Sequence, residues 1–185
     1  PNPMNRMNAQ DISTPTYWRD PRTLKVLGMG TALPGPPVTT SELLEHVEAR
    51  FHVPVVRRGA ALAHRLGIET RHICRDFAER HETPRPGHTN PELAARAVRA
   101  ALDEAQLDVT DLAYLIGHTT SPAQLAPPNI ALVADWLDFT GPYMELRQAC
   151  TGFANALVIA QGLLAVPTAK AIAIVGSETG SVYFD

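Results

Sequence analysis

The stretch that decides the fold runs from residue 143 to residue 165 and reads YMELRQACTGFANALVIAQGLLA. Its first four residues, Tyr143 to Leu146, have the composition of a short strand, and the mostly apolar run from Cys150 to about Ala165 is long enough for a helix. Because this helix has no continuous polar face, we expect it to be buried between layers. Cys150 then lies where a strand ends and a buried helix begins.

Strands and helices alternate on both sides of this stretch. The sequence predicts strands at 23–28, 113–117 and 171–175, and helices near 41–50, 91–105 and 130–137. Thr40 or Ser41 and then Asn90 are the expected N-caps. This alternation indicates an α/β layered domain with a five-stranded, mixed and mostly parallel sheet. Residues 1–22 have no hydrophobic period, so we expect a polar arm or disordered tail ahead of a domain over 23–185.

Composition narrows the possible classes of protein. Hydrophobic residues make up 45% of the chain, which is enough for a globular core, and the net charge of −3 makes nucleic acid an unexpected partner. No apolar run is long enough to cross a membrane, so no membrane span is expected. The two cysteines, Cys74 and Cys150, have no metal-binding spacing and fit a reducing cytoplasm. We expect no metal and no cofactor.

A cysteine at the beginning of a helix has a specific chemical advantage. The unpaired backbone N–H groups and the positive end of the helix dipole stabilise an anion such as a thiolate, which is the nucleophilic form. The same N–H groups can donate to the oxyanion of a thioester under attack. The alternative is that Cys150 is a small core residue, the usual fate of a free cysteine. Position alone leaves both interpretations open.

Five motifs in order along the chain resemble the beta-ketoacyl-ACP synthase III family. They are GMGTALP at 28–34, RLGIETRHI at 65–73, HTTSP at 118–122, ACTGF at 149–153 and VGSE at 175–178. The resemblance extends from residue 24 to about residue 180. It implies a thiolase-like fold with αβαβα layers, built from two similar halves and working as a homodimer. Since the chain stops at Asp185, we expect it to be the N-terminal half.

The resemblance also implies a reaction. Cys150 would take an acyl group from a thioester of CoA or of an acyl carrier protein and condense it with a malonyl-type thioester by decarboxylative Claisen chemistry. Family members carry a His and an Asn for this chemistry in the second half, beyond this chain. The resemblance places Arg65, Thr119, Ala126 and Gly180 at substrate-binding positions, whereas His118 is expected to be structural or pocket-lining.

Three positions differ from the family pattern and modify this expectation. Ala61 stands where members that use short acyl-CoA have a Trp that stacks on adenine, so a carrier-bound donor is favoured. Ala126 and Gly180 stand where a Phe and a Leu close the acyl pocket of short-chain members. The hypothesis is a long or bulky acyl group, in specialised or fatty acid metabolism, unless Leu125 or Tyr183 refills the space.

Two rival functions remain open from the sequence. In one, a family member acylates an oxygen or nitrogen acceptor instead of a malonyl carbanion. In the other, the chain is a non-catalytic partner subunit in which Cys150 only packs.

Overall fold

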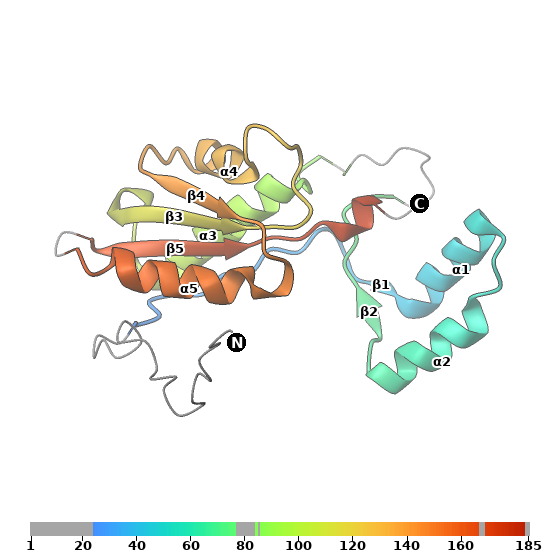
Figure 1. The fold of residues 1–185 in the computed structure, drawn as a ribbon. Helices are drawn as coiled ribbons and strands as arrows, with labels where there is room; N and C mark the ends of the chain where they lie inside the picture. The colour runs from blue at the N-terminus through green and yellow to red at the C-terminus, as the bar shows by residue number, and fades with distance from the viewer. Residues whose placement is uncertain (1–23, 77–83, 85, 167–168, 184–185) are drawn as a thin grey trace, which may run out of the picture.

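The computed structural model describes residues 24–76, 84, 86–166 and 169–183. Its body is a parallel sheet of three strands in the order β4-β3-β5, with helices on both faces (Figure 1). The strands are β3 (Leu112–His118), β4 (Tyr143–Leu146) and β5 (Ala171–Gly176). Helices α3 (Asn90–Ala105) and α4 (Asn129–Leu137) cover one face, and α5 (Gly152–Leu163) covers the other. The described residues also form the 3-10 helices η2 (Val109–Asp111), η3 (Ala149–Thr151) and η4 (Gly180–Tyr183).

The alternation of side chains along β5 explains why the sheet is covered on both faces. Ala171 and Val175 belong to the core under α3 and α4, whereas Ile172 and Ile174 pack into the second core under α5. Successive side chains of a strand point to opposite faces, so a strand that is apolar at every position needs a helix on each side. The predicted layered α/β fold is confirmed.

Helix α3 carries the predicted apolar stripe, but it begins one residue earlier than predicted. Its N-cap is Thr89, which forms a reciprocal capping box with Glu92, and Asn90 is the first helical residue. Helix α1 (Thr40–Phe51) begins in the same way, with Thr39 and Glu42 as the capping pair. The Thr-x-x-Glu spacing therefore decides both starts, and the predicted N-caps at Asn90 and at Thr40 or Ser41 are wrong by one or two positions.

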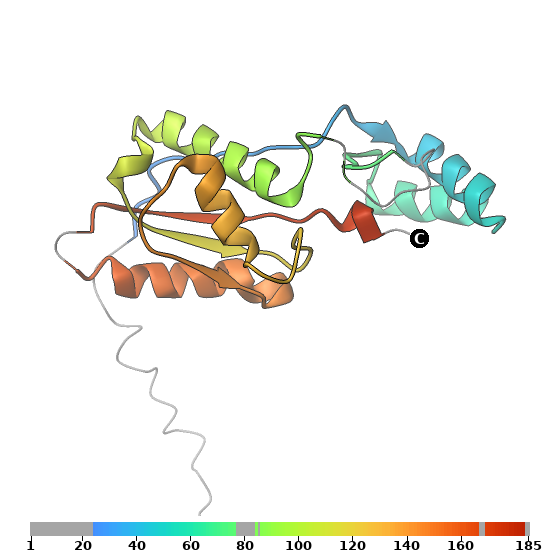
Figure 2. The same cartoon turned by 90° about the horizontal axis from the view of Figure 1, so that it is seen from above.

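A helical hairpin extends from the body beyond the carboxyl ends of the strands (Figures 1 and 2). It consists of α1 and α2 (Val56–Leu66). Two short antiparallel strands, β1 (Val38–Thr39) and β2 (Thr70–Arg71), pair at its base. The backbone N–H of Thr40 also donates to the carbonyl of Glu69 at 2.8 Å, which closes the base of the hairpin.

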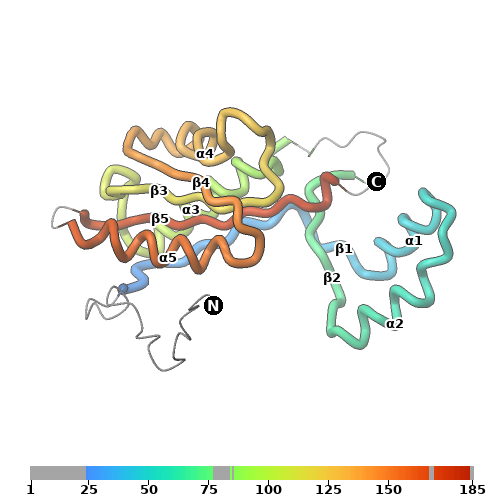
Figure 3. Tube along the Cα trace, in the orientation of Figure 1, coloured from blue at the N-terminus to red at the C-terminus, as the bar shows by residue number. Residues whose placement is uncertain are grey.

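The predicted five-stranded sheet is wrong for the residues that the structure describes, which form one three-stranded and one two-stranded sheet. The predicted strand at 23–28 is not formed over its described part, residues 24–28. This segment runs along α3 instead (Figure 3), so close that a Cβ on Gly28 would lie 2.3 Å from the Ala101 carbonyl oxygen. The predicted arm at 1–22 lies outside the described residues.

The sequence analysis predicted that helix α5 is buried between two layers. In the described residues only one of its sides is buried. Its small residues Gly152, Ala156 and Ala160 face the sheet and are buried. On its other side Phe153 is 48% exposed and Leu157 is 40% exposed. The described residues cover only one side of this mostly apolar helix.

Among the residues that the structure describes, no helix is long and apolar enough to cross a membrane.

Candidate active site

Cys150 lies in the turn between β4 and α5. The strand ends at Leu146, the 3-10 helix η3 holds Cys150 at its centre, and α5 begins two residues later. The side chain is exposed to solvent. The predicted place between a strand and a helix is therefore confirmed, with a 3-10 turn inserted between them.

Hydrogen bonds and backbone conformation define the shape of this turn. Both the backbone N–H and the hydroxyl of Thr151 donate to the carbonyl of Gln148, at 3.1 and 2.8 Å. The side-chain amide of Asn155 donates to the side-chain oxygen of Gln148 at 2.7 Å. Ala149 has φ of 45°, a left-handed conformation that costs a residue with a Cβ about 1–2 kcal/mol. The turn immediately before Cys150 is thus held in an unfavourable conformation by its neighbours.

The imidazole of His118 packs against the start of α5. Its Nδ1 atom lies 3.2 Å from the carbonyl oxygen of Leu146. A Cβ added to Gly152 would lie 2.1 Å from the same nitrogen. Only a residue without a side chain allows this contact, which explains the glycine two residues after Cys150.

A buried polar network joins the segments at the carboxyl ends of the strands. The side-chain amide of Asn90 donates to the carbonyls of Ser121 and Ser177 at 2.8 and 3.0 Å, and lies 3.0 Å from the Thr119 hydroxyl. Its carbonyl oxygen accepts from the amide of Asn129 at 2.8 Å. This network ties the first turns of α3 and α4 to the loops after β3 and β5. The sequence interpretation treated Asn90 only as a cap and did not identify Asn129.

Glu178 fastens the loop after β5 to the loop after β3. Its carboxylate accepts from the backbone N–H and hydroxyl of Thr120 at 2.7 and 2.8 Å, and from the hydroxyl of Ser121 at 2.6 Å. Burial opposes ionisation of this carboxyl, but the hydrogen bonds from Ser121 and Thr120 and the nearby His118 outweigh it and lower the pKa of Glu178. An ionised Glu178 therefore stabilises the loops next to the Cys150 turn.

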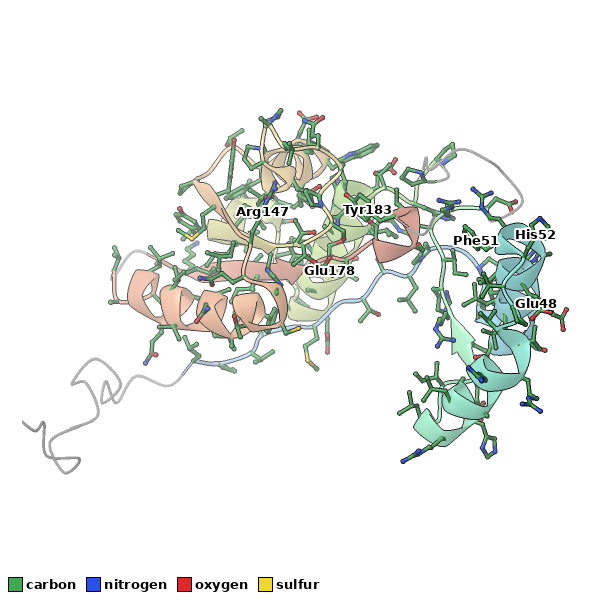
Figure 4. The ribbon with its side chains drawn as sticks, turned by 45° about the vertical axis from the view of Figure 1, so that its right-hand side comes forward. Glu48, Phe51, His52, Arg147, Glu178 and Tyr183 are labelled. Carbon is green, nitrogen blue, oxygen red and sulfur yellow. The ribbon has the colours of Figure 1, made fainter. Side chains whose placement is uncertain are left out.

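Glu145 connects the strand before the turn to α4. One carboxylate oxygen accepts from the backbone N–H of Ile130, in the first turn of α4, at 2.8 Å. The other accepts from Nε of Arg147 at 2.7 Å, and the Glu145 side chain is only 6% exposed. Figure 4 shows Arg147 and Glu178 on the body of the molecule, away from the hairpin residues that it labels. Neither Glu145 nor Glu178 was identified from the sequence as a candidate site residue.

The predicted substrate-binding residues occupy three different settings. Thr119 is buried within the polar network, with its hydroxyl accepting from the backbone N–H of Ser121 at 3.1 Å. Ala126 is exposed on the loop that follows β3, and Gly180 is exposed at the first position of η4. Arg65 is exposed on α2. The structure brings Thr119 to the same end of the sheet as Cys150 and puts Arg65 on the separate hairpin.

The loop that carries Ala126 and the 3-10 helix that begins at Gly180 are joined by a hydrogen bond. The hydroxyl of Tyr183 donates to the carbonyl of Pro122 at 3.0 Å, which holds η4 against the loop after β3. A Cβ on Gly180 would meet no atom within 4 Å. Leu125 is 85% exposed and Tyr183 is 59% exposed. Within the described residues, no group of three or more His, Cys, Asp or Glu could hold a metal ion.

No protein-family model matches the sequence. Among curated proteins, the chain is 34% identical over 119 residues to the beta-ketoacyl-[acyl-carrier-protein] synthase III of Nitratidesulfovibrio vulgaris, and 31% identical over 157 residues to that of Thiobacillus denitrificans. These alignments cover 64% and 84% of this chain but only 33% and 44% of the relatives. The chain thus spans less than half the length of the curated relatives that it matches.

Among solved structures, the chain is also similar to condensing enzymes and again covers less than half of their length. The chain superposes on AbyA1, a tetronic acid condensing enzyme, with a TM-score of 0.73 and 28% identity, over 88% of this chain and 47% of that one. It superposes on the 3-oxoacyl-[acyl-carrier-protein] synthase III from Aquifex aeolicus VF5 with a TM-score of 0.63 and 26% identity, over 85% of this chain and 45% of that one.

Proposed function

Because this chain belongs to the thiolase-like condensing enzymes, we propose that Cys150 accepts an acyl group from a thioester donor and passes it to a carbon nucleophile. In the first step the Cys150 thiolate attacks the donor carbonyl, and the donor thiol leaves. In the second step a malonyl-type thioester loses carbon dioxide, and the resulting carbanion attacks the acyl carbon. The new carbon–carbon bond forms as the bond to the Cys150 sulfur breaks.

The observation that carries this proposal is the setting of Cys150. Its side chain is exposed in a turn that leads directly into the first turn of α5. The N–H groups and the dipole of that helix end can stabilise the oxyanion of the attacked thioester. An exposed sulfur is also open to a thioester arm, which a packed core cysteine such as Cys74, 1% exposed, is not.

We assign the proton and oxyanion chemistry of the second step to a His and an Asn from the part of the enzyme that this chain does not span. The setting of His118 supports this division of roles. Its Nδ1 atom is engaged with the Leu146 carbonyl, and its ring fills the space beside Gly152. These contacts suit a residue that holds the turn rather than one that moves protons during the reaction.

The proposed acyl group is long or bulky, and the proposed donor is a carrier protein. Small residues support the first point, since Ala126 and Gly180 are exposed and a Cβ on Gly180 would meet no atom within 4 Å. The second point rests on Ala61, an exposed residue of α2 that offers no aromatic face for adenine to stack on.

Intact-mass measurement of the assembled enzyme with a series of acyl thioesters tests the nucleophile. The expected result is the mass of one acyl group on Cys150, absent in Cys150→Ala and retained in the control Cys74→Ala. An acyl adduct that survives in Cys150→Ala contradicts the proposal. Adding a malonyl thioester then separates the reactions, since condensation releases carbon dioxide and yields a β-ketoacyl thioester, whereas an oxygen or nitrogen acceptor yields an ester or amide.

A further inference from the structure

Ala149, the residue immediately before Cys150, has a backbone conformation that helix capping does not explain. In the described part of the chain, four residues other than glycine have a left-handed backbone. Three of them, His52, Gln106 and Asp138, are C-caps of helices, where this conformation is common. Ala149 instead begins η3, with φ of 45°. Strained residues of this kind persist only where their neighbours hold them, and they cluster at functional sites.

Gln148 holds this strained residue from its N-terminal side. Its backbone carbonyl accepts two hydrogen bonds from Thr151, at 3.1 Å from the backbone N–H and at 2.8 Å from the hydroxyl. Its side-chain oxygen accepts from the amide of Asn155 at 2.7 Å. We call this last contact, between Gln148 and Asn155, the amide clasp. It joins a residue two positions before Cys150 to one five positions after it, so the strained turn is closed on both sides.

Asn155 is fixed in place by the helix that carries it. Helix α5 lies along the sheet (Figure 1), and Gly152 and Ala156 are buried on the side that faces the sheet. Between Gly152 and Ala160, Asn155 is the only polar side chain. Asn has a lower helix propensity than Ala or Leu, so its presence here suits a contact outside the helix. Its amide gives Gln148 a partner on a rigid element.

We infer that Gln148 and Asn155 are positioning residues for the acylation of Cys150. This inference rests on the proposed function. The clasp keeps Ala149 left-handed, and the backbone angles of Ala149 set the direction of the Cα–Cβ bond of Cys150 relative to β4. Without the clasp, Ala149 relaxes to an ordinary conformation and the sulfur turns away from the donor carbonyl. Small errors in this geometry cost large factors in rate, because the reacting atoms must be aligned and about 3–3.5 Å apart.

A purely structural hydrogen bond would have a different signature. The clasp is exposed to solvent, and a hydrogen bond that replaces one to water adds little net stability. Removing the clasp should therefore leave the free energy of unfolding almost unchanged while it slows acylation.

Single-turnover acylation of Cys150 in the assembled enzyme, followed by intact mass at increasing donor concentration, gives the maximal rate and the KM of the donor. Gln148→Met keeps the length of the side chain and removes its amide, and Asn155→Leu removes the amide at the other end. Each should lower the maximal rate about tenfold and change KM less than about twofold. Urea midpoints should match that of the unchanged enzyme. Gln161→Met, the same substitution near the far end of α5, is the matched control and should leave the rate and KM unchanged.

Two double variants test whether the residues act as a pair. Gln148→Met combined with Asn155→Leu should be no slower than either single variant, since all three lose the same contact, whereas a loss of about a hundredfold means independent effects and overturns the inference. Gln148→Asn alone shortens the side chain by one methylene and should break the clasp. Combining it with Asn155→Gln restores the summed length of the two side chains and should recover most of the rate. A rate as low as in Gln148→Asn alone contradicts the inference.

A crystal structure of the Gln148→Met enzyme separates this inference from the proposed function. Ala149 should leave the left-handed region in this variant. An Ala149 that stays left-handed, or an unchanged acylation rate, overturns the positioning role and leaves Cys150 as the nucleophile. If no thioester acylates Cys150 in the unchanged enzyme, the proposed function is wrong, and the conformation of Ala149 in the variant still decides whether the clasp holds the turn.

Discussion

The Nδ1 atom of His118 lies 3.2 Å from the carbonyl oxygen of Leu146. The two residues are register partners at the ends of the adjacent parallel strands β3 and β4. The same imidazole touches the backbone of Gly152, where α5 begins. One side chain therefore contacts both strand ends and the helix between which Cys150 is held.

Gly152→Ala should disturb this contact. The added methyl group would overlap the His118 ring, and displacing a ring that is packed and hydrogen-bonded should lower the free energy of unfolding by about 1–3 kcal/mol. Urea denaturation followed by circular dichroism measures this change. Gly162→Ala is the matched control, since the added methyl meets nothing within 4 Å in the same helix, and it should raise stability by up to about 1 kcal/mol. Equal effects of the two substitutions would show that His118 does not restrain the turn.

Asn90→Ala should destabilise the carboxyl end of the sheet. It removes the Asn90 amide as donor to the Ser177 carbonyl and one of the two donors to the Ser121 carbonyl, which keeps the Thr179 hydroxyl. An unpaired buried polar group costs about 1–3 kcal/mol. Asn155→Ala removes one exposed hydrogen bond to Gln148 and should change the free energy of unfolding by no more than about 0.5 kcal/mol. Chemical denaturation of both variants compares them, and a loss at Asn90 no larger than at Asn155 would contradict the role of the network.

Glu178 should make stability depend on pH in the acid range. Its pKa in the folded protein is lowered from the ordinary value of 4.5, so the folded state binds fewer protons than the unfolded state. Its stabilising contribution is therefore fully present above pH 4.5 and is lost as the pH falls through the lowered pKa. Urea midpoints between about pH 7 and pH 3 should fall less steeply in Glu178→Gln than in the unchanged protein. If the urea midpoints of the two proteins fall equally steeply with pH, Glu178 does not contribute to the pH dependence of stability.

Gly180→Leu should shorten the preferred acyl group. The added side chain enters space that is open in the structure, so it should fill part of the proposed acyl site without straining the fold. Competition between acyl thioesters of different length, read as the masses of the acyl-enzymes, measures the preference. Gly162→Leu adds the same side chain near the far end of α5 and should leave the preference unchanged. A preference for acetyl in the unchanged enzyme would contradict the proposal of a long acyl group.

Most of the elements of the body could be predicted because their signals are local. The strands β3 to β5 are short apolar runs, and α3 carries its stripe at regular spacing, so each was predicted within about two residues of its observed bounds. Helix α2 was not predicted from the sequence, and the glycine in its second turn lowers the helix propensity of this segment. In the structure Pro54 lies in the connection before α2, and Gly59 supplies the room that Leu44 of α1 needs.

The supporting residues of the site could not be predicted in the same way. Cys150 was found because its motif is contiguous, whereas the Asn90 amide meets the Ser177 carbonyl across 87 residues of sequence. Glu178 reaches Thr120 across 58 residues. Such contacts form only when the parallel strands bring their carboxyl ends together. They cannot be predicted from the spacing of residues within a short segment. The prediction of a strand at 23–28 is wrong for a related reason. Gly28 packs against α3, which begins over sixty residues later in the sequence, so the local sequence does not indicate this contact.

The exposed apolar side of α5 lies next to the proposed nucleophile, Cys150. Phe153 follows Cys150 by three residues, about one helical turn, and is 48% exposed. Any protein surface that shields this phenyl ring from water also borders the sulfur next to it. Replacing Phe153 with a charged residue would thus make the helix easier to keep in solution while wetting the place where a reactive thioester has to survive.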